Sequence, residues 1–210
     1  MAMLRVGLTG SIATGKSYVT SVLAEFGCHV LDADQTARLV VEPGAAGLSA
    51  VVDAFGEQVL RDDGTLDRQK LGALVFNDEA QRKLLNSILH PYIIAKQDER
   101  LREWEKADPD GIAVVDAALM IESGGYKRFD KLIVVFCRPE VQLERLMARD
   151  GISCEEAQRR IASQMTQEEK LKFADYSIDT SESFDSARRQ TEEVYRALSR
   201  IDQKDLRSEI

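Results

Sequence analysis

Basic residues are in the minority in this sequence of 210 residues, with 28 Lys and Arg against 36 Asp and Glu and a net charge of -8. A protein that binds nucleic acid through its overall charge needs a surplus of Lys and Arg, because it must neutralise phosphates. The composition argues against that class, so an anionic ligand must be held by a local site. With 44% hydrophobic residues the chain can bury a full core, and one principal domain is expected.

Cysteine and long apolar runs are also scarce. The three cysteines are widely spaced and lack a CxxC pair, so they suggest neither a disulfide framework nor a zinc cluster and fit a reduced, cytoplasmic compartment. The longest clean apolar run, residues 132–137, is too short to span a bilayer, and the amino terminus reads as a strand rather than a signal peptide. We therefore expect a soluble, unprocessed protein without a membrane partner.

Short β-branched runs alternate with longer helical patterns along the chain. Fully apolar strands separated by helices indicate an α/β protein with a parallel sheet covered on both faces. Five strands are predicted, at residues 4–9, 29–32, 112–116, 131–136 and 176–178.

Two helical regions interrupt this alternation. Residues 43–107 are too long for a simple crossover and predict a second subdomain, in which Asp78 and Gln81 form a capping box that opens a long helix interrupted at Pro91. Residues 139–173, called the lid below, predict a projecting helix pair. Its first helix runs from Pro139 to Gly151, and its second opens with a capping box of Ser153 and Glu156.

The strongest motif, called the phosphate loop below, lies between the first strand and an amphipathic helix. Its pattern, G-x-x-x-x-G-K-[ST], predicts nucleoside triphosphate binding, because the backbone amides can point at phosphate oxygens and the helix adds its positive end. The lysine neutralises the phosphates and the final serine ligates Mg²⁺. The eight residues are Gly10, Ser11, Ile12, Ala13, Thr14, Gly15, Lys16 and Ser17.

Carboxylates follow two of the predicted strands, at the edge where ligands bind in such sheets. Asp34 is our candidate for orienting and deprotonating an acceptor hydroxyl, with Asp32 helping to hold Mg²⁺ through water. Alternatively, one of the two caps the helix that begins near Gln35. Asp116 closes the third strand, where a Walker B carboxylate would support Mg²⁺, although strand-end Asp residues are common.

Basic residues offer weaker signals. Arg145 and Arg149 lie four apart on one face of the first lid helix, where they could close over the phosphates. By themselves, with Glu144 and Asp150 nearby, they are more readily interpreted as a pair of solvated surface arginines. His90 precedes Pro91, and a lone His on an amphipathic helix is more often structural than a ligand.

Over nearly its whole length the sequence resembles the dephospho-CoA kinase family. The phosphate loop alone would select no family, but an ordered set of segments does. They are 7–10, 32–34 followed by 37–38, 42–44, 55–56, 64–68, Phe76, 90–91, 119–122, 142–146, Gln164 and 174–175.

This resemblance implies a P-loop NTPase-type three-layer fold with a nucleotide core (about 1–42, 108–138 and 174–200), a helical acceptor subdomain (43–107) and the lid. It implies phosphorylation of the ribose 3′-hydroxyl of dephospho-CoA by ATP with Mg²⁺, without nucleic acid or an obligatory protein partner. Asp34 would be the general base, and Lys16 and Arg145 would stabilise the transferring group. The nucleotide site would include Tyr18 and Arg149, and the acceptor would be bordered by Arg38, His90, Leu119 and Glu122.

Departures from the family pattern are few. Ser11 and Ala13 replace usual glycines, Ala118 replaces a usual proline, and residues 179–182 replace Asp-Asn-x-Gly. Two other functions remain open: a nucleoside or nucleotide monophosphate kinase of the same fold, and a nucleotide-dependent switch. The sequence carries no Asn-Lys-x-Asp guanine-reading segment, and the long helical insertion favours a larger acceptor.

Overall fold

The computed structural model describes residues 3–76 and 78–201. The described residues form two compact units, one up to Leu31 and again from Trp104 onward, the other Asp32–Glu103. Residues 32–42, which were expected in the nucleotide core, thus belong to the same compact unit as the helical region, and the lid belongs to the same unit as the sheet. The division into core, acceptor subdomain and lid stays a prediction.

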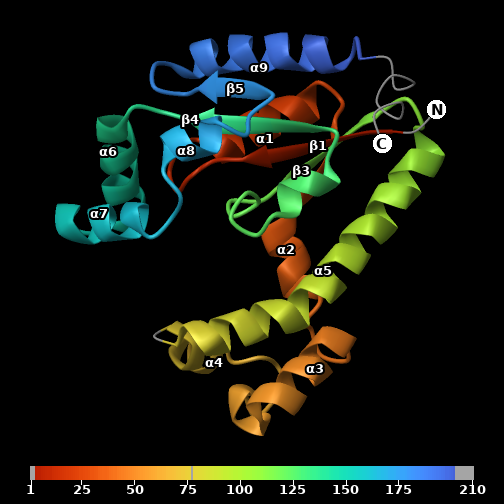
Figure 1. The fold of residues 1–210 in the computed structure, drawn as a ribbon, viewed down its shortest axis with the longest axis vertical. Coiled ribbons are helices and arrows are strands. Elements are labelled where there is room, and N and C mark those ends of the chain that lie inside the picture. The colour runs from red at the N-terminus through yellow and green to blue at the C-terminus, as the bar shows by residue number, and fades with distance from the viewer. Residues whose placement is uncertain (1–2, 77, 202–210) are drawn as a thin grey trace. The chain divides into compact units, whose positions relative to one another are not determined.

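A five-stranded parallel sheet organises the first unit, in the order β2-β3-β1-β4-β5 (Figure 1). The predicted strands are confirmed, with the last ending one residue later than expected. They are β1 (Leu4–Thr9), β2 (His29–Asp32), β3 (Ile112–Asp116), β4 (Lys131–Phe136) and β5 (Tyr176–Asp179). Because Leu8 of β1 pairs in register with Asp116 of β3, the ends of these two strands lie side by side.

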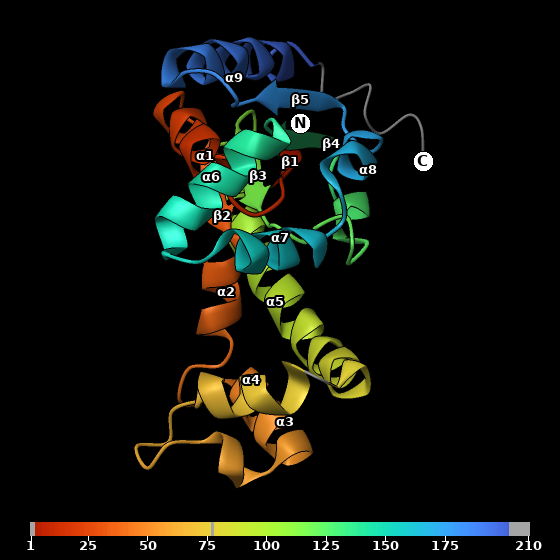
Figure 2. The ribbon, with the colours of Figure 1, turned by 90° about the vertical axis from the view of Figure 1, so that its left-hand side faces the viewer.

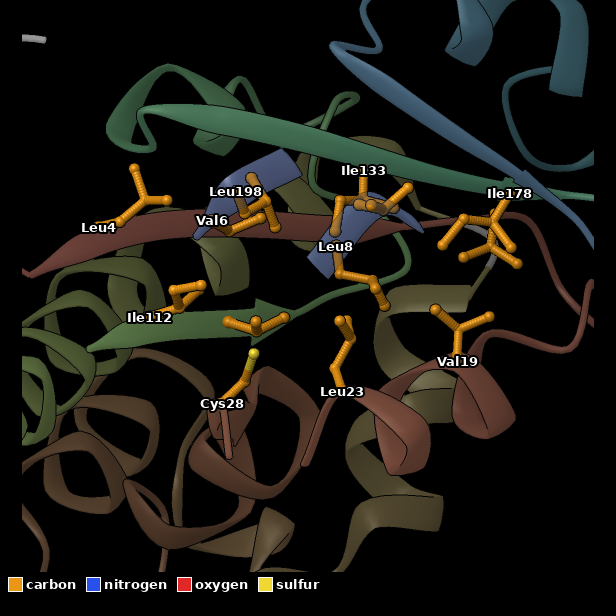
Figure 3. Packing of buried hydrophobic residues seen from close by; sticks show 13 residues of the cluster. Leu4, Val6, Leu8, Val19, Leu23, Cys28, Ile112, Ile133, Ile178 and Leu198 are labelled. Atoms are coloured by element: carbon orange, nitrogen blue, oxygen red, sulfur yellow. The ribbon is translucent and has the colours of Figure 1, made fainter. Parts of the chain in front are cut away.

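Helices α1 (Lys16–Glu25) and α9 (Phe184–Leu198) cover one face of the sheet and contact each other. Val6 and Leu8 of β1 point from the sheet into this layer, where Val19 and Leu23 of α1 meet them (Figure 3). The alternate strand residues, such as Val115 and Val134, are buried on the opposite face. Burial on both faces explains the unbroken apolar runs of β3 (112–115) and β4 (132–136).

The lid contains α6 (Pro139–Asp150), α7 (Cys154–Ala162) and α8 (Gln167–Leu171). The first two form a packed pair (Figure 2), which confirms the predicted helix pair, and Gly151 ends α6 in the left-handed conformation. Ser153 caps α7, because its hydroxyl oxygen accepts from the amide of Glu156. The reciprocal bond expected of a capping box is not formed, and the Glu156 carboxylate instead accepts from Arg159 and Arg160.

The second unit is helical, with α2 (Ala33–Leu39), α3 (Ala46–Phe55), the 3-10 turn η1 (Glu57–Val59), α4 (Arg68–Phe76) and most of α5 (Glu79–Ala107). The expected interruption at Pro91 is wrong, because α5 continues through it. The helix instead bends in its first half, which contains Pro91 (Figure 1). A proline removes one hydrogen bond and kinks a helix, and here the helix bends without ending.

Val51, Phe55 and Val59 lie in the core of this helical unit, with Ile88 and Tyr92 of α5 packed against it. Its apolar residues therefore supply a hydrophobic cluster separate from that of the sheet. Asp78 accepts a hydrogen bond from the amide of Gln81, as predicted for the start of α5. In the part of the chain that the structure describes, no helix is long and apolar enough to cross a membrane.

Candidate active site

The phosphate loop connects the carboxyl end of β1 to the first turn of α1. A Cβ on Gly10 would lie 2.6 Å from the carbonyl oxygen of Val135, so no larger residue fits there. Gly15 has φ 84° and is the N-cap of α1. Because glycine has no side chain, it does not cap the first amides of the helix. The first amides of the helix thus face outward as donors, an arrangement suited to an anion.

Lys16 is paired with the carboxylate predicted to support the metal. Its ammonium donates to Oδ1 of Asp116, and the hydroxyl of Thr20, one turn further along α1, donates to Oδ2 at 2.8 Å. Asp116 is buried and Ser17 exposed. The carboxyl end of β3 therefore lies against the first turn of α1, as the sheet order requires.

Two glutamines of the lid bind the backbone of one residue of the phosphate loop, Ile12. The amide of Ile12 donates to Oε1 of Gln164 at 2.8 Å, and the carbonyl of Ile12 accepts from Nε2 of Gln142 at 2.8 Å. Gln142 is itself bound by the side-chain amide of Gln167 at 2.9 Å. Gln142 and Gln164 lie in the segments that carry the family resemblance. Their residue types and spacing did not by themselves predict that they bind the phosphate loop.

Arg145 reaches the same loop through Thr180, the residue that follows β5. Its Nη1 donates to Oγ1 of Thr180 at 3.0 Å and its Nη2 to the Thr180 carbonyl at 2.7 Å. Arg145 is half-buried, so it is not one of a pair of solvated surface arginines. The thiol of Cys137 lies close by, and burial raises its pKa while Arg145 acts in the opposite direction.

Arg149, four residues further along α6, has a different environment. Its guanidinium binds the neighbouring Asp150 at 2.7 Å and is more than half exposed. This hydrogen bond raises the pKa of Arg149 and lowers that of Asp150. A contact between Arg149 and the nucleotide stays a prediction, as does the nucleotide contact of Tyr18, whose hydroxyl here donates to the carbonyl of Phe184 at 3.1 Å.

Leu119 and Glu122 lie in the turn that follows β3. Leu119 is 52% exposed, which leaves its side chain accessible to a ligand. The carboxylate of Glu122 accepts from the buried ammonium of Lys170 at 2.8 Å. Glu122 thus has a structural partner within the first unit, and its contact with the acceptor stays a prediction.

The remaining predicted site residues belong to the second unit. Asp32 caps α2, because its Oδ1 accepts from the amides of Asp34 at 2.7 Å and Gln35 at 3.1 Å. The helix therefore begins at Ala33, and of the two carboxylates Asp32 is the cap. Asp34 in the first turn, Arg38 in the last turn and His90 on α5 are exposed.

A cavity of about 560 Å³ opens in this second unit between the end of α2, the start of α3 and the middle of α5. Apolar and small side chains form most of its wall, together with Lys96, Glu99 and Arg102. Lys96 and Glu99 form an ion pair at 2.7 Å. The cavity begins one residue after Arg38, and residue patterns did not predict it, because its lining comes from three separate helices.

Comparison with known proteins gives one consistent result. A family model described as dephospho-CoA kinase matches residues 4–186. A protein of that name from Leifsonia xyli subsp. xyli is 42% identical over 196 residues, covering 93% of this chain and 99% of the relative. One from Listeria innocua serovar 6a is 44% identical over 187 residues, covering 88% and 92%.

Solved structures agree with these sequences. Dephospho-CoA kinase from Campylobacter jejuni is 30% identical with a TM-score of 0.63, covering 94% of this chain and 98% of that one. The structure of TT1252 from Thermus thermophilus has a TM-score of 0.80 at 29% identity, covering 94% and 99%. Sequence and fold therefore match over nearly the whole chain.

Proposed function

Because the chain belongs to the dephospho-CoA kinase family, we propose that it transfers the γ-phosphoryl group of ATP to the ribose 3′-hydroxyl of dephospho-CoA, giving CoA and ADP. The observation that carries this proposal is the family match over residues 4–186. The phosphate loop at the carboxyl end of β1, with Lys16 and Asp116 beside it, supports the transfer from ATP. In the reaction the acceptor oxygen bonds to the γ-phosphorus while the bond from that phosphorus to the β,γ-bridging oxygen breaks.

The phosphate loop and two basic side chains, Lys16 and Arg145, stabilise the negative charge of the phosphates. Outward-facing amides at the start of α1 suit the phosphates. Lys16 neutralises phosphate oxygens, which requires its ammonium to exchange its bond with Asp116 for one with the nucleotide. Arg145 holds the equatorial oxygens that gain negative charge in a loose transition state.

Asp34 orients the acceptor hydroxyl in line with the γ-phosphorus and receives its proton late in the transfer. The different positions of Asp32 and Asp34 support this role. Asp32 caps α2, whereas Asp34 is exposed in the first turn of that helix. A second role for Asp32, in holding the metal through water, stays a prediction.

The reaction is expected to use Mg²⁺, and the residues fit this cation. The exposed hydroxyl of Ser17 and the carboxylate of Asp116 are hard oxygen donors, and Mg²⁺ takes few protein ligands beside phosphates and water. The described residues contain no group of three or more His, Cys, Asp or Glu that could hold a metal ion. When bound with ATP, the cation neutralises phosphate charge during transfer.

The cavity of the helical unit is our candidate for binding part of the acceptor away from its ribose. Its wall combines Leu39, Val40 and Tyr92 with Arg102 and with Lys96, whose ammonium is paired with Glu99. The apolar side chains suit an alkyl part of the ligand, and Arg102 suits a phosphate. Arg38, His90, Leu119 and Glu122 remain candidates for other acceptor contacts. We place the reaction in the cytoplasm, where the three free cysteines stay reduced.

A panel of acceptors tests this proposal. ADP release from ATP and Mg²⁺ is measured with dephospho-CoA, AMP, CMP and free nucleosides under identical conditions. We expect kcat/KM for dephospho-CoA to exceed that for every other acceptor by at least about 100-fold, because a site built for polar groups of the true substrate rejects analogues lacking them. Faster transfer to AMP or CMP would support a nucleotide monophosphate kinase instead, and preferential binding of GTP would support a switch protein.

A further inference from the structure

Thr180 joins three parts of the first unit. Its amide donates to the carbonyl of Phe136 at the end of β4 at 2.9 Å. Its hydroxyl lies 2.6 Å from the carbonyl oxygen of Thr14 in the phosphate loop. Its hydroxyl and carbonyl oxygens also accept the two bonds from the Arg145 guanidinium. At 5% exposure, the residue has little access to water that could replace these partners.

The direction of these bonds follows from their chemistry. Arg145 can only donate, and a carbonyl oxygen can only accept. The hydroxyl of Thr180 therefore accepts from Nη1 of Arg145 and gives its single proton to a carbonyl. The Thr14 carbonyl at 2.6 Å is a closer acceptor than that of Phe136 at 3.3 Å. One hydroxyl thus links the guanidinium to the backbone of the phosphate loop.

The loop also packs tightly on this residue. A Cβ added to Gly15 would lie 3.1 Å from Oγ1 of Thr180, closer than side chains normally approach. Thr180 therefore restricts the position of the loop by contact as well as by hydrogen bonding. A guanidinium held at two points loses much of the freedom of a long side chain, which is what precise placement of a catalytic charge requires.

We propose that Thr180 is a positioning residue for phosphoryl transfer, holding the Arg145 guanidinium against the phosphate loop and acting on the reaction through Arg145. The proposal rests on the role given to Arg145 in the proposed function. It assigns a purpose to a position where the sequence departs from the pattern of its family. The hydroxyl is the group that carries the role, because the Thr180 carbonyl is retained in any substitution.

The test is a double-mutant cycle of Thr180→Val with Arg145→Ala, in which valine keeps the shape of threonine and removes only the hydroxyl. In the wild-type background we expect Thr180→Val to lower kcat about 10-fold, the effect of losing one hydrogen bond to a charged group. In the Arg145→Ala background the same substitution should change kcat less than about 2-fold, because the two residues act as one unit. Equal losses in both backgrounds, or no loss in the wild-type background, would overturn the proposal.

Two further measurements refine this test. The first distinguishes loss of the hydroxyl from a general change at position 180, and the second tests the coupling without depending on which acceptor is used. Thr180→Ser, which keeps the hydroxyl, should recover most of the lost turnover, whereas a loss as large as that of Thr180→Val counts against the hydroxyl. Calorimetric affinity for the Mg²⁺ complex of a non-hydrolysable ATP analogue is measured across the same cycle. The coupling between Thr180 and Arg145 should persist there even if dephospho-CoA is not the acceptor. An additive cycle in these affinities, together with turnover on dephospho-CoA, would reject the role of Thr180 and leave the proposed function intact.

Discussion

The ammonium of Lys170 lies 2.8 Å from Oε1 of Glu122, and the side chain of Lys170 is completely buried. The ammonium also donates to the carbonyl of Ala118 at 2.8 Å, and that carbonyl accepts from the hydroxyl of Thr9 at 3.1 Å. A buried charge must be paired, because its desolvation is costly. This pair therefore joins α8 of the lid to the turn after β3 and to the residue that precedes the phosphate loop.

Replacing Glu122 with Gln should destabilise the protein. The substitution keeps the size of the side chain and leaves the Lys170 ammonium buried without a counter-charge. We expect the free energy of unfolding to fall by about 3 kcal/mol, measured by urea denaturation. An unchanged midpoint would contradict a structural role for the pair.

Lys170→Met is the matched control for this substitution. It removes the buried charge and leaves Glu122, whose side chain is partly exposed, accessible to water, so it should cost less stability than Glu122→Gln. The two variants also test the predicted acceptor contact. If Glu122 borders the acceptor, Glu122→Gln should raise KM for dephospho-CoA and Lys170→Met should raise it less.

Ala13 adopts φ 61° within the phosphate loop. The left-handed conformation costs a residue with a Cβ about 1 kcal/mol, whereas glycine adopts it freely. Ala13→Gly should therefore raise the free energy of unfolding by about 0.5 kcal/mol after the greater entropy of unfolded glycine is deducted. Ala148→Gly, in helix α6, is the control and should lower it by up to about 1 kcal/mol. A loss of stability in Ala13→Gly would mean that the side chain makes contacts that outweigh the strain.

The cysteines should differ in reactivity, because the thiolate is the reactive species. Burial raises the pKa of Cys28 to about 12 and also raises that of Cys137, whereas Cys154 is exposed. At pH 8 a disulfide-exchange reagent should modify one thiol rapidly, and Cys154→Ser should abolish that phase. Two or more fast thiols would contradict the described burial.

The same shifts have a consequence for stability at high pH. Between the ordinary thiol pKa and about 12, the unfolded chain loses a proton that native Cys28 retains. Stability is fully present below the ordinary pKa and falls as the pH rises through this interval. Urea midpoints measured from pH 8 upward should decline less in Cys28→Ala than in the wild type.

The fold was largely predictable, because each strand has a residue pattern that local sequence reveals. Residues 112–115 and 132–136 are unbroken apolar runs, as expected of parallel strands buried on both faces. The continuity of α5 through Pro91 was not predictable. Whether a proline ends a helix or bends it depends on tertiary contacts, here those of Ile88 and Tyr92 with the core of the helical unit, and these are invisible to local propensity.

The site was predictable where a motif or strand end fixes a residue, and less so where distant segments meet. Lys16 and Asp116 were identified from the loop pattern and the strand end, and the structure pairs them. Thr180 and Lys170 were not identified as site-supporting residues. Their roles depend on contacts with residues 35 and 48 positions away in the chain, which no local pattern encodes.

Asp34→Asn separates positioning of the acceptor from binding. Asparagine keeps the size and most of the hydrogen bonding of aspartate but cannot accept the hydroxyl proton. We expect kcat and kcat/KM to fall together by about 100-fold or more, with calorimetric affinities for ATP and dephospho-CoA nearly unchanged.

Asp32→Asn is the matched comparison, because asparagine caps a helix about as well as aspartate. Its loss of turnover should be smaller than that of Asp34→Asn. Near-normal turnover in Asp34→Asn with a steep loss in Asp32→Asn would reverse the assignment and move the proton-accepting role to Asp32.

Identification of the reaction product is the decisive test of phosphoryl transfer to the ribose 3′-hydroxyl of dephospho-CoA. Purified protein is incubated with ATP, Mg²⁺ and dephospho-CoA, and the products are followed by phosphorus NMR, with Lys16→Ala as the variant expected to lose turnover. We expect one new phosphomonoester on the ribose 3′-oxygen for each ADP released, in a product identical to CoA. Release of ADP without that phosphomonoester, or phosphorylation at another position, would contradict this expectation.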